Sequence, residues 1–335
     1  MAPRDWLPDR HLPGFECLTL DLGSDDRGPL VASLVRRQGA APRPRGVLYL
    51  HGFIDYFFHA HVAEVIEAAG LAFYALDLRR HGRSWHLDQL PNYTDDLSEY
   101  EEALDAALAV LRDRGVERVA LLGHSTGGLL SCLYAQRHPA RVDALVLNSP
   151  FFEFRLGASG PLLLRGAELL ARLAPEADLP GFFSPYYAAS LHRRYRGEWD
   201  FDLSLKPLQG LPIYAGWVAA VREAQRRLHR GLGLGHPVLA LRSARSVQPA
   251  RWSDDLLHAD AVLDVQAIER WAARIGPRAS VEAFAGGLHD LFLSPRPVRD
   301  EVLARVVTWL GEVLGDAARS PVGQARLPAA GPQRR

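Results

Sequence analysis

The sequence predicts an α/β fold, in which a mostly parallel eight-stranded sheet carries helices on both faces and an inserted helical lid. Short β-rich runs alternate with amphipathic helical runs from Phe15 to Leu147, the alternation stops after Pro150, and the strand pattern resumes at Pro237. With 335 residues, 48% of them hydrophobic, the chain is long enough for one large α/β domain with an insertion.

The strands are expected in three groups. Phe15–Leu22 and Leu30–Arg36 alternate apolar and polar residues, as an antiparallel pair does. Two strands are expected after the insertion, at Pro237–Leu241 and Ser280–Phe284. The four runs between these groups are apolar on both faces, which is typical of central strands: Gly46–Leu50, Leu71–Leu76, Arg118–Leu122 and Ala144–Leu147.

Helices are expected where apolar residues recur three and four positions apart. Three of them connect the central strands, at His59–Ala69, Asp96–Arg114 and Gly127–Arg137. Two more are expected near the end, at Gln266–Ile275 and Val298–Leu314, and the last can pack back over the sheet.

The chain is expected to divide into a core, a lid and a tail. Residues 1–154 and 236–317 form the core, and residues 155–235 form the lid. Residues 318–335, rich in Pro, Ala, Gly and Arg, lack the apolar periodicity that packing needs and are expected to be disordered. The lid is expected to contain two helices, Leu162–Leu173 and Ile213–Leu228.

Charge and cysteine content exclude several classes of protein. The 39 basic and 39 acidic side chains balance, whereas proteins that bind nucleic acids or anionic membranes usually carry a basic excess. Cys17 and Cys132 are too few and too far apart for a disulfide framework or a metal clip. The sequence opens without a signal-peptide core and contains no apolar stretch of about 18 residues. We therefore expect a cytoplasmic protein without stable membrane insertion.

The segment Gly123-His124-Ser125-Thr126-Gly127 carries most of the functional information. It is a G-x-S-x-G sequence between an expected strand and an expected helix, the setting of a nucleophile elbow. Such a sharp turn strains the serine backbone, and the two glycines remove side chains that would collide. We expect Ser125 to be the nucleophile, and an ordinary turn with an N-capping serine is the alternative.

The remaining groups of a serine hydrolase have candidates at the ends of other strands. His51-Gly52-Phe53 follows the third strand, so the backbone N–H groups of Phe53 and Thr126 are the expected oxyanion donors. We expect His51 to bond within this turn rather than to transfer protons. His289 follows the last strand and is the expected general base, with His258 as the alternative.

The acid that orients this base should follow the strand Pro237–Leu241. Asp260 is the expected acid, because it lies on a loop anchored by aliphatic residues just before a helix. Asp264 is better suited to be the N-cap of that helix. Asp254 and Asp255 remain alternatives for the acid.

These motifs resemble the α/β-hydrolase superfamily, and within it the branch of monoglyceride lipases, lysophospholipases and serine aminopeptidases. His51-Gly52 is similar to the oxyanion turn of that branch, Gly123–Gly128 to its GHSxGG elbow, and Gly287–Asp290 to its catalytic-histidine loop. Ala259–Asp264 is similar to the loop that bears its acid, and Asp77–Ser84 to its D-x-R-G-x-G-x-S turn. The resemblance implies an α/β-hydrolase fold and a serine hydrolase.

The sequence departs from this pattern at three places. Arg80 replaces the usual turn glycine, and Ile54-Asp55-Tyr56 replaces the G-E-H that lipases of this branch carry. The stretch from Leu241 to Ala259 is longer than the usual loop between strand and acid. Monoglyceride specificity is therefore not implied.

The predicted function is hydrolysis of carboxylic esters of apolar acyl groups through an acyl-enzyme, with a small-molecule ester as the partner and without a metal or cofactor. An amidase, peptidase or acyltransferase would use the same triad, and a non-catalytic binding protein is a further alternative. Enzymes of this fold with a carboxylate nucleophile are disfavoured by Ser125. Five residues near the motifs are expected to line the substrate pocket: Tyr56, Phe57, His124, Phe151 and Phe152.

Overall fold

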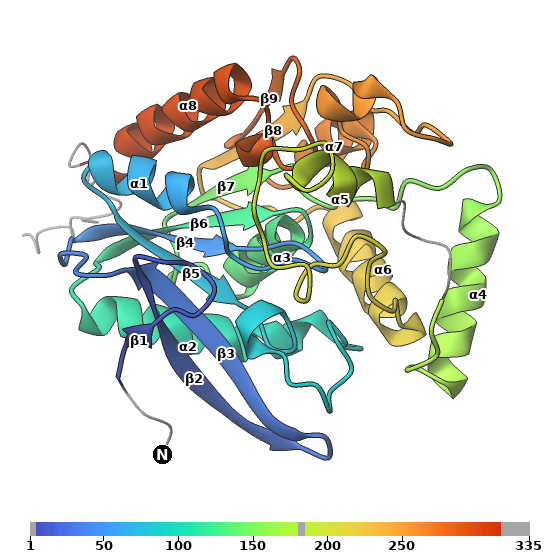
Figure 1. The fold of residues 1–335 in the computed structure, drawn as a ribbon, viewed down its shortest axis with the longest axis horizontal. Helices are drawn as coiled ribbons and strands as arrows, with labels where there is room; N and C mark the ends of the chain where they lie inside the picture. The colour runs from blue at the N-terminus through green and yellow to red at the C-terminus, as the bar shows by residue number, and fades with distance from the viewer. Residues whose placement is uncertain (1–4, 180–184, 316–335) are drawn as a thin grey trace, which may run out of the picture.

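The computed structural model describes residues 5–179 and 185–315, and these form a nine-stranded sheet in the order β1-β2-β3-β5-β4-β6-β7-β8-β9 (Figure 1). Strands β4 to β9 pair in parallel, whereas β1, β2 and β3 complete one edge with antiparallel pairing. The strands are β1 (Leu7–Pro8), β2 (Phe15–Asp25), β3 (Gly28–Arg37), β4 (Arg45–Leu50), β5 (Ala72–Asp77), β6 (Arg118–His124), β7 (Ala144–Asn148), β8 (Val238–Ser243) and β9 (Ala279–Phe284).

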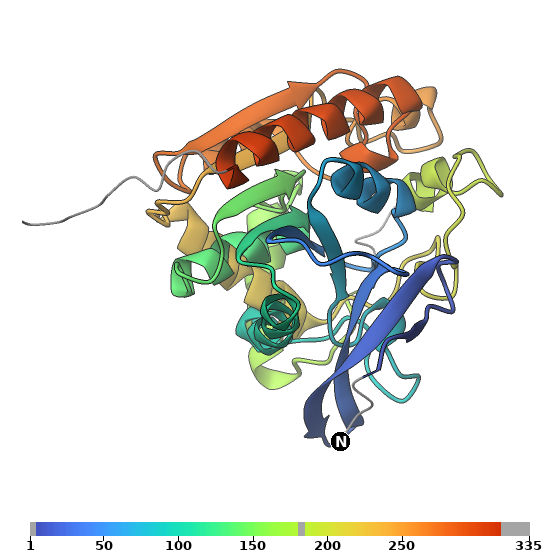
Figure 2. The ribbon, with the colours of Figure 1, turned by 90° about the vertical axis from the view of Figure 1, so that its left-hand side faces the viewer.

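Helices cover both faces of the sheet. Figures 1 and 2 show α1 and α8 on one face and α2 and α3 on the other, and each pair buries its own apolar cluster against the strands. All residues of β5, β7 and β8 are buried, as expected for central strands. The helices of this core are α1 (Ala60–Ala68), α2 (Tyr100–Asp113), α3 (Thr126–Arg137), α7 (Val265–Ala272) and α8 (Arg296–Leu314).

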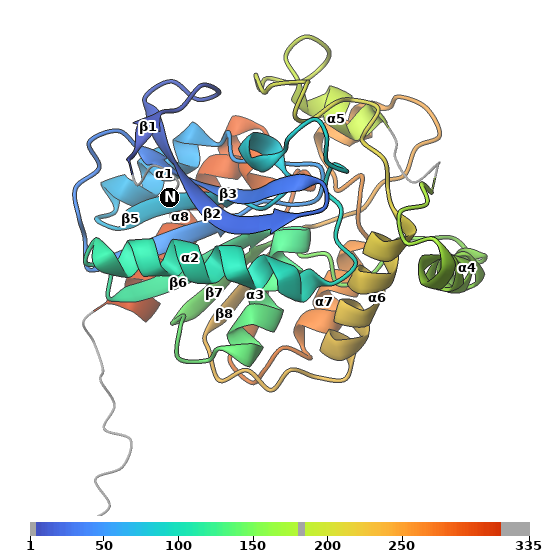
Figure 3. The same cartoon turned by 90° about the horizontal axis from the view of Figure 1, so that it is seen from below.

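Three helices lie between β7 and β8: α4 (Gly160–Leu173), α5 (Pro185–Leu191) and α6 (Ala215–His229). Helix α6 packs against α3 and α4 and buries Trp217 in the same cluster as α2 and α3. Helix α4 lies at the periphery (Figures 1 and 3), where Leu162 and Leu173 are 73% and 82% exposed. The stretch from Tyr187 to Leu205 instead packs on the loops that follow β4 and β9.

The predicted α/β class, the mostly parallel sheet and the helices on both faces are confirmed. The described residues form nine strands rather than eight, because Leu7–Pro8 pairs with β2 over only two residues, too few to show a period. Helix α5 was not predicted, since seven residues among aromatic clusters give no helical repeat. The expected disordered tail, 318–335, lies outside the described residues.

Candidate active site

Ser125 occupies the sharp turn between β6 and α3. Its φ is +52°, a region that non-glycine residues rarely adopt, and its N–H donates to Asn148 O at 3.0 Å. A Cβ on Gly123 would lie 2.4 Å from Gly127 O, and a Cβ on Gly127 would lie 2.5 Å from His51 O. The turn therefore requires both glycines, and it holds Ser125 at the carboxyl end of the sheet.

His289 joins this serine to a buried carboxylate. His289 Nε2 lies 3.2 Å from Ser125 Oγ, and His289 Nδ1 lies 3.0 Å from Asp260 Oδ2. The other oxygen of Asp260 accepts the N–H groups of Val262 at 2.7 Å and Leu263 at 2.8 Å. Burial alone would raise the pKa of Asp260, but His289 and these hydrogen bonds hold it below its usual value.

The other candidate acids lie elsewhere. Asp264 is the N-cap of α7, as expected, and accepts the N–H of Gln266 at 3.1 Å. Asp254 and Asp255 lie in an exposed 3-10 turn, and Asp255 pairs with Arg245. His258, the alternative base, ends that turn and is exposed. The segment after β8 is long, but its two ends are hydrogen-bonded to each other near Asp260. Asp260 N donates to Arg245 O at 3.0 Å, and Val247 N donates to Asp260 O at 2.8 Å.

The loop after β4 passes beside the serine. A Cβ on Gly52 would lie 3.1 Å from Ser125 Cβ, so this loop, which continues into Phe53, lies next to the elbow. Thr126 is the first residue of α3, so its N–H has no acceptor within the helix. His51 Nε2 accepts the N–H of Leu78 at 3.0 Å, so Nδ1 carries the proton and donates to Gly52 O at 2.7 Å. Both nitrogens of His51 thus bond to backbone, in the structural role expected for it.

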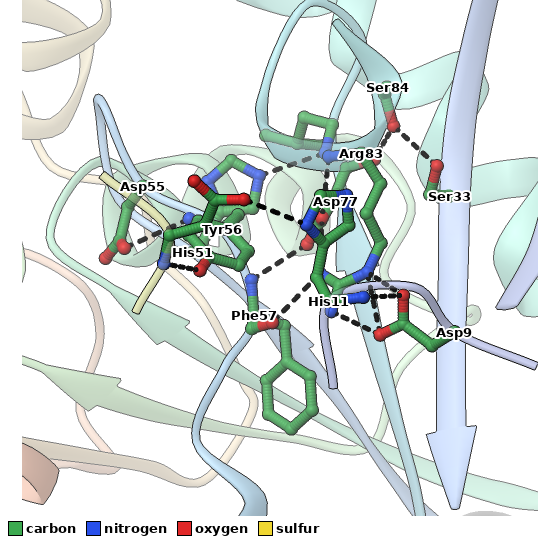
Figure 4. Close-up of polar contacts among 12 residues, drawn as sticks. Asp9, His11, Ser33, His51, Asp55, Tyr56, Phe57, Asp77, Arg83 and Ser84 are labelled. Carbon is green, nitrogen blue, oxygen red and sulfur yellow. Dashed lines mark hydrogen bonds and ion pairs between the residues drawn. The ribbon is translucent and has the colours of Figure 1, made fainter. Parts of the chain in front are cut away.

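A buried ionic network holds the loop after β4 in place (Figure 4). Asp77 Oδ1 accepts the N–H of Phe57 at 2.9 Å, and Asp77 Oδ2 pairs with Arg83 Nη1 at 2.8 Å. Arg83 also pairs with Asp9, which is buried too. Arg80 has a φ of +61°, a backbone region that glycine adopts without strain.

The five expected pocket residues lie in different environments. Tyr56 is buried under the insertion, where its hydroxyl accepts the N–H of Asp202 at 2.7 Å. Phe57 and Phe152 are fully buried in the two core clusters, and neither lines the cavity described below. Phe151 is half-buried against Phe154 and Trp217.

His124, the fifth expected pocket residue, is buried beside the triad. Its ring centroid lies 4.9 Å from that of His289, and its Nδ1 donates to Asn148 O at 3.2 Å. Burial lowers the pKa of His124 to about 4, despite the opposing effect of Asp290. The imidazole is therefore neutral at neutral pH and adds no charge beside His289.

A narrow cavity adjoins the loop after β4. Phe53 and Trp217 stack across it with ring centroids 3.8 Å apart. Most of its lining is apolar or aromatic: His51, Gly52, Phe53, Leu78, His81, Leu97, Tyr100, Thr126, Gly127, Leu130 and Trp217. Trp217 could not be assigned to this site from sequence, because it is one of seven tryptophans and comes from the distant helix α6.

A second polar cluster, which the sequence reasoning missed, lies behind the triad. The Asp290 carboxylate accepts hydrogen bonds from His59 Nε2 at 2.9 Å and from Asn148 Nδ2 at 2.7 Å. Nearby, Lys206 Nζ donates to Asp55 Oδ1 at 2.7 Å. The ligand atoms of Asp55, His124 and Asp290 lie within 4.8 Å of one another, a spacing that suits a metal ion. Lys206 already supplies a positive charge there, so the group does not fit an added cation.

Comparison with protein families identifies the family of the chain. The family model of the serine aminopeptidases, S33, matches residues 42–241. The chain belongs to this family. None of the described helices of this S33 member is long and apolar enough to cross a membrane.

Two relatives of this S33 member illustrate its sequence similarity. A monoacylglycerol lipase of Mycolicibacterium smegmatis is 39% identical over 140 residues, which cover 39% of this chain and 47% of the lipase. The chain thus spans about half the length of that relative. A monoglyceride lipase homolog of Monkeypox virus is 21% identical over 254 residues, covering 74% of this chain and 82% of the homolog.

Solved structures establish the α/β-hydrolase fold of the chain. The monoacylglycerol lipase of Paleococcus ferrophilus has a TM-score of 0.63 at 21% identity, over 84% of this chain and 98% of that one. A soluble variant of monoglyceride lipase from Saccharomyces cerevisiae has a TM-score of 0.63 at 17% identity, over 93% and 99%. These structures confirm the predicted α/β-hydrolase fold, and the family model confirms the expected likeness to the serine-aminopeptidase branch.

Proposed function

We propose that the protein is a serine hydrolase that cleaves carboxylic esters of apolar acyl groups through an acyl-enzyme. The observation that carries this proposal is the unbroken chain of contacts from Ser125 through His289 to the buried Asp260. The lipase names of its relatives support the same substrate class.

The geometry suggests a role for each group. His289 Nε2 takes the proton from Ser125 Oγ as this oxygen attacks the ester carbonyl, and the backbone N–H groups of Phe53 and Thr126 stabilise the resulting oxyanion. His289 then gives the proton to the departing alkoxide, which leaves as an alcohol. Water attacks the acyl-enzyme with His289 again as the base, the bond to Ser125 Oγ breaks, and His289 returns the proton to this oxygen as the carboxylic acid leaves. Asp260 holds the imidazole in one tautomer and keeps its own negative charge throughout.

The insertion and the cell compartment complete the proposal. Residues 155–235 are proposed to act as a lid over the core formed by 1–154 and 236–317, with α6 as the part fixed to that core. The exposed leucines of α4 offer an apolar surface that could contact apolar substrates. The cytoplasm is the proposed location, and a small apolar ester is the proposed partner.

A series of p-nitrophenyl esters from acetate to palmitate tests the proposal. The wild-type protein should hydrolyse them with a maximum at one chain length, and Ser125→Ala should lower turnover by several orders of magnitude while the protein remains folded. p-Nitroanilide analogues should react far more slowly. Equal rates on anilides would favour an amidase, and wild-type turnover by Ser125→Ala would exclude this serine as the nucleophile.

A further inference from the structure

Lys206, the only lysine of the chain, is buried where the insertion meets the core. It lies between α5 and α6, and its ammonium group donates to Asp55 Oδ1 at 2.7 Å. The two side chains are 8% and 3% exposed. In a buried ion pair the attraction between the charges offsets their desolvation only when the geometry is good. Removal of one partner leaves an unpaired buried charge.

Asp55 belongs to the loop that is proposed to stabilise the oxyanion. It lies two residues after Phe53, and Ile54 between them has a φ of +50°. Asp55 Oδ1 also accepts the N–H of Tyr56 at 3.0 Å, so the carboxylate bonds at once to its own loop and to Lys206. The position of this loop therefore depends on a contact with the insertion.

The carboxylate that binds Lys206 also lies beside the loop that carries His289. Asp290, the next residue, is fully buried, and its carboxylate lies within 4.8 Å of the Asp55 carboxylate and the His124 ring. Lys206 is among the groups that hold the pKa values of both aspartates below their usual range, against the effect of burial. Without this cation, two buried carboxylates would repel each other at the junction of the oxyanion loop and the histidine loop.

We propose that Lys206 is a positioning residue that couples the seating of the insertion to the assembly of the oxyanion hole. The proposal rests on the proposed function. It differs from a purely structural role because the oxyanion hole acts on the transition state, so its loss should lower kcat with little change in KM.

The experiment compares Lys206→Met, Lys206→Arg and Asp55→Asn with the wild-type protein. For each, kcat and KM are measured with p-nitrophenyl butyrate, together with the rate of inactivation by a fluorophosphonate, whose reaction also places an oxygen in the oxyanion hole. Lys206→Met and Asp55→Asn should lower kcat and the inactivation rate by about tenfold or more, with KM changed by less than about threefold. Lys206→Arg keeps the charge and should recover most of both rates.

A matched control is another ion pair between insertion and core, Arg299 with Glu198 at 3.0 Å, because neither residue belongs to the loop after β4. Arg299→Met should leave both rates near those of the wild type. The inference is overturned if folded Lys206→Met and Asp55→Asn proteins react with the fluorophosphonate as fast as Arg299→Met. If Lys206→Met does not fold, Asp55→Asn alone decides in the same way. If the wild-type protein itself is not labelled, the proposed function fails rather than this inference.

Discussion

Ser125 adopts a backbone conformation that other parts of the chain must hold in place. A non-glycine residue at positive φ costs about 1–3 kcal/mol. The N–H of Ser125 donates to Asn148 O at 3.0 Å, and Ser125 O accepts the N–H of Phe151 at 2.9 Å, so β7 and the loop after it clamp the turn from both sides. The backbone of Ser125, and with it the position of its hydroxyl, is thus held by groups that play no part in the proposed chemistry.

Asp260 and Asp264 offer a test of the proposed acid, because they lie four residues apart and have different partners. Asp260→Asn should lower kcat by about 10⁴-fold, since the amide cannot hold the required tautomer of His289. Asp264→Asn should retain nearly full activity, because Asn also caps helices well. The measurement is steady-state hydrolysis of a p-nitrophenyl ester by both variants. Equal effects of the two substitutions would contradict the assignment.

At the scale of the element, the turn Asp77–Ser84 shows how a short segment supports a loop from another part of the chain. A Cβ on Gly82 would lie 2.3 Å from Tyr56 Cβ, so only glycine lets the turn approach the oxyanion loop this closely. Arg83 Nη1 donates to Phe57 O at 2.9 Å and pairs with the buried Asp77. The family motif revealed this turn, but the role of Asp9 as a second partner of Arg83 carries no local sequence signal.

Arg83→Met should destabilise the protein by about 3–5 kcal/mol, because Asp9 and Asp77 would remain buried without their cation. Arg193→Met removes an exposed pair with Asp200 and should cost at most about 1 kcal/mol. Urea unfolding monitored by tryptophan fluorescence measures both. Similar losses in the two variants would show that the buried network contributes no more than a surface pair.

At the scale of the whole molecule, short sequence patterns predicted the strands and the serine turn, which depend on neighbouring residues. The strands from β2 to β9 lie within a few residues of their expected bounds, because apolar runs bounded by turn residues have few alternatives. The G-x-S-x-G segment is likewise a short pattern, and it was enough to predict Ser125 as the nucleophile. The contact of Lys206 with Asp55 joins residues 151 positions apart, and Trp217 reaches Phe53 across a similar separation. Such contacts depend on how the insertion packs, and no short pattern encodes them.

Three histidines that are neutral in the folded protein should make its stability depend on pH. Burial lowers the pKa values of His61 and His124 to about 4 and that of His81 to about 3, from 6.5. Below about pH 6.5 the unfolded chain binds protons that the folded protein does not, so the stability present above this pH is lost as pH falls toward 4. Each histidine contributes about 1.4 kcal/mol per pH unit within that window.

Urea unfolding between pH 6 and pH 5 measures this slope. His81→Gln should reduce it by about 1.4 kcal/mol per pH unit, because one of the three sites is then absent. An identical slope in wild type and variant would show that His81 does not titrate differently in the two states.

The central claim is that Ser125 carries the acyl group during turnover, and intact-protein mass spectrometry tests it most directly. The wild-type protein, quenched in acid during hydrolysis of a p-nitrophenyl ester, should gain the mass of one acyl group, and fragmentation should place it on Ser125. Ser125→Ala, folded under the same conditions, should gain none. An acyl group that forms equally on the Ser125→Ala protein would contradict the account.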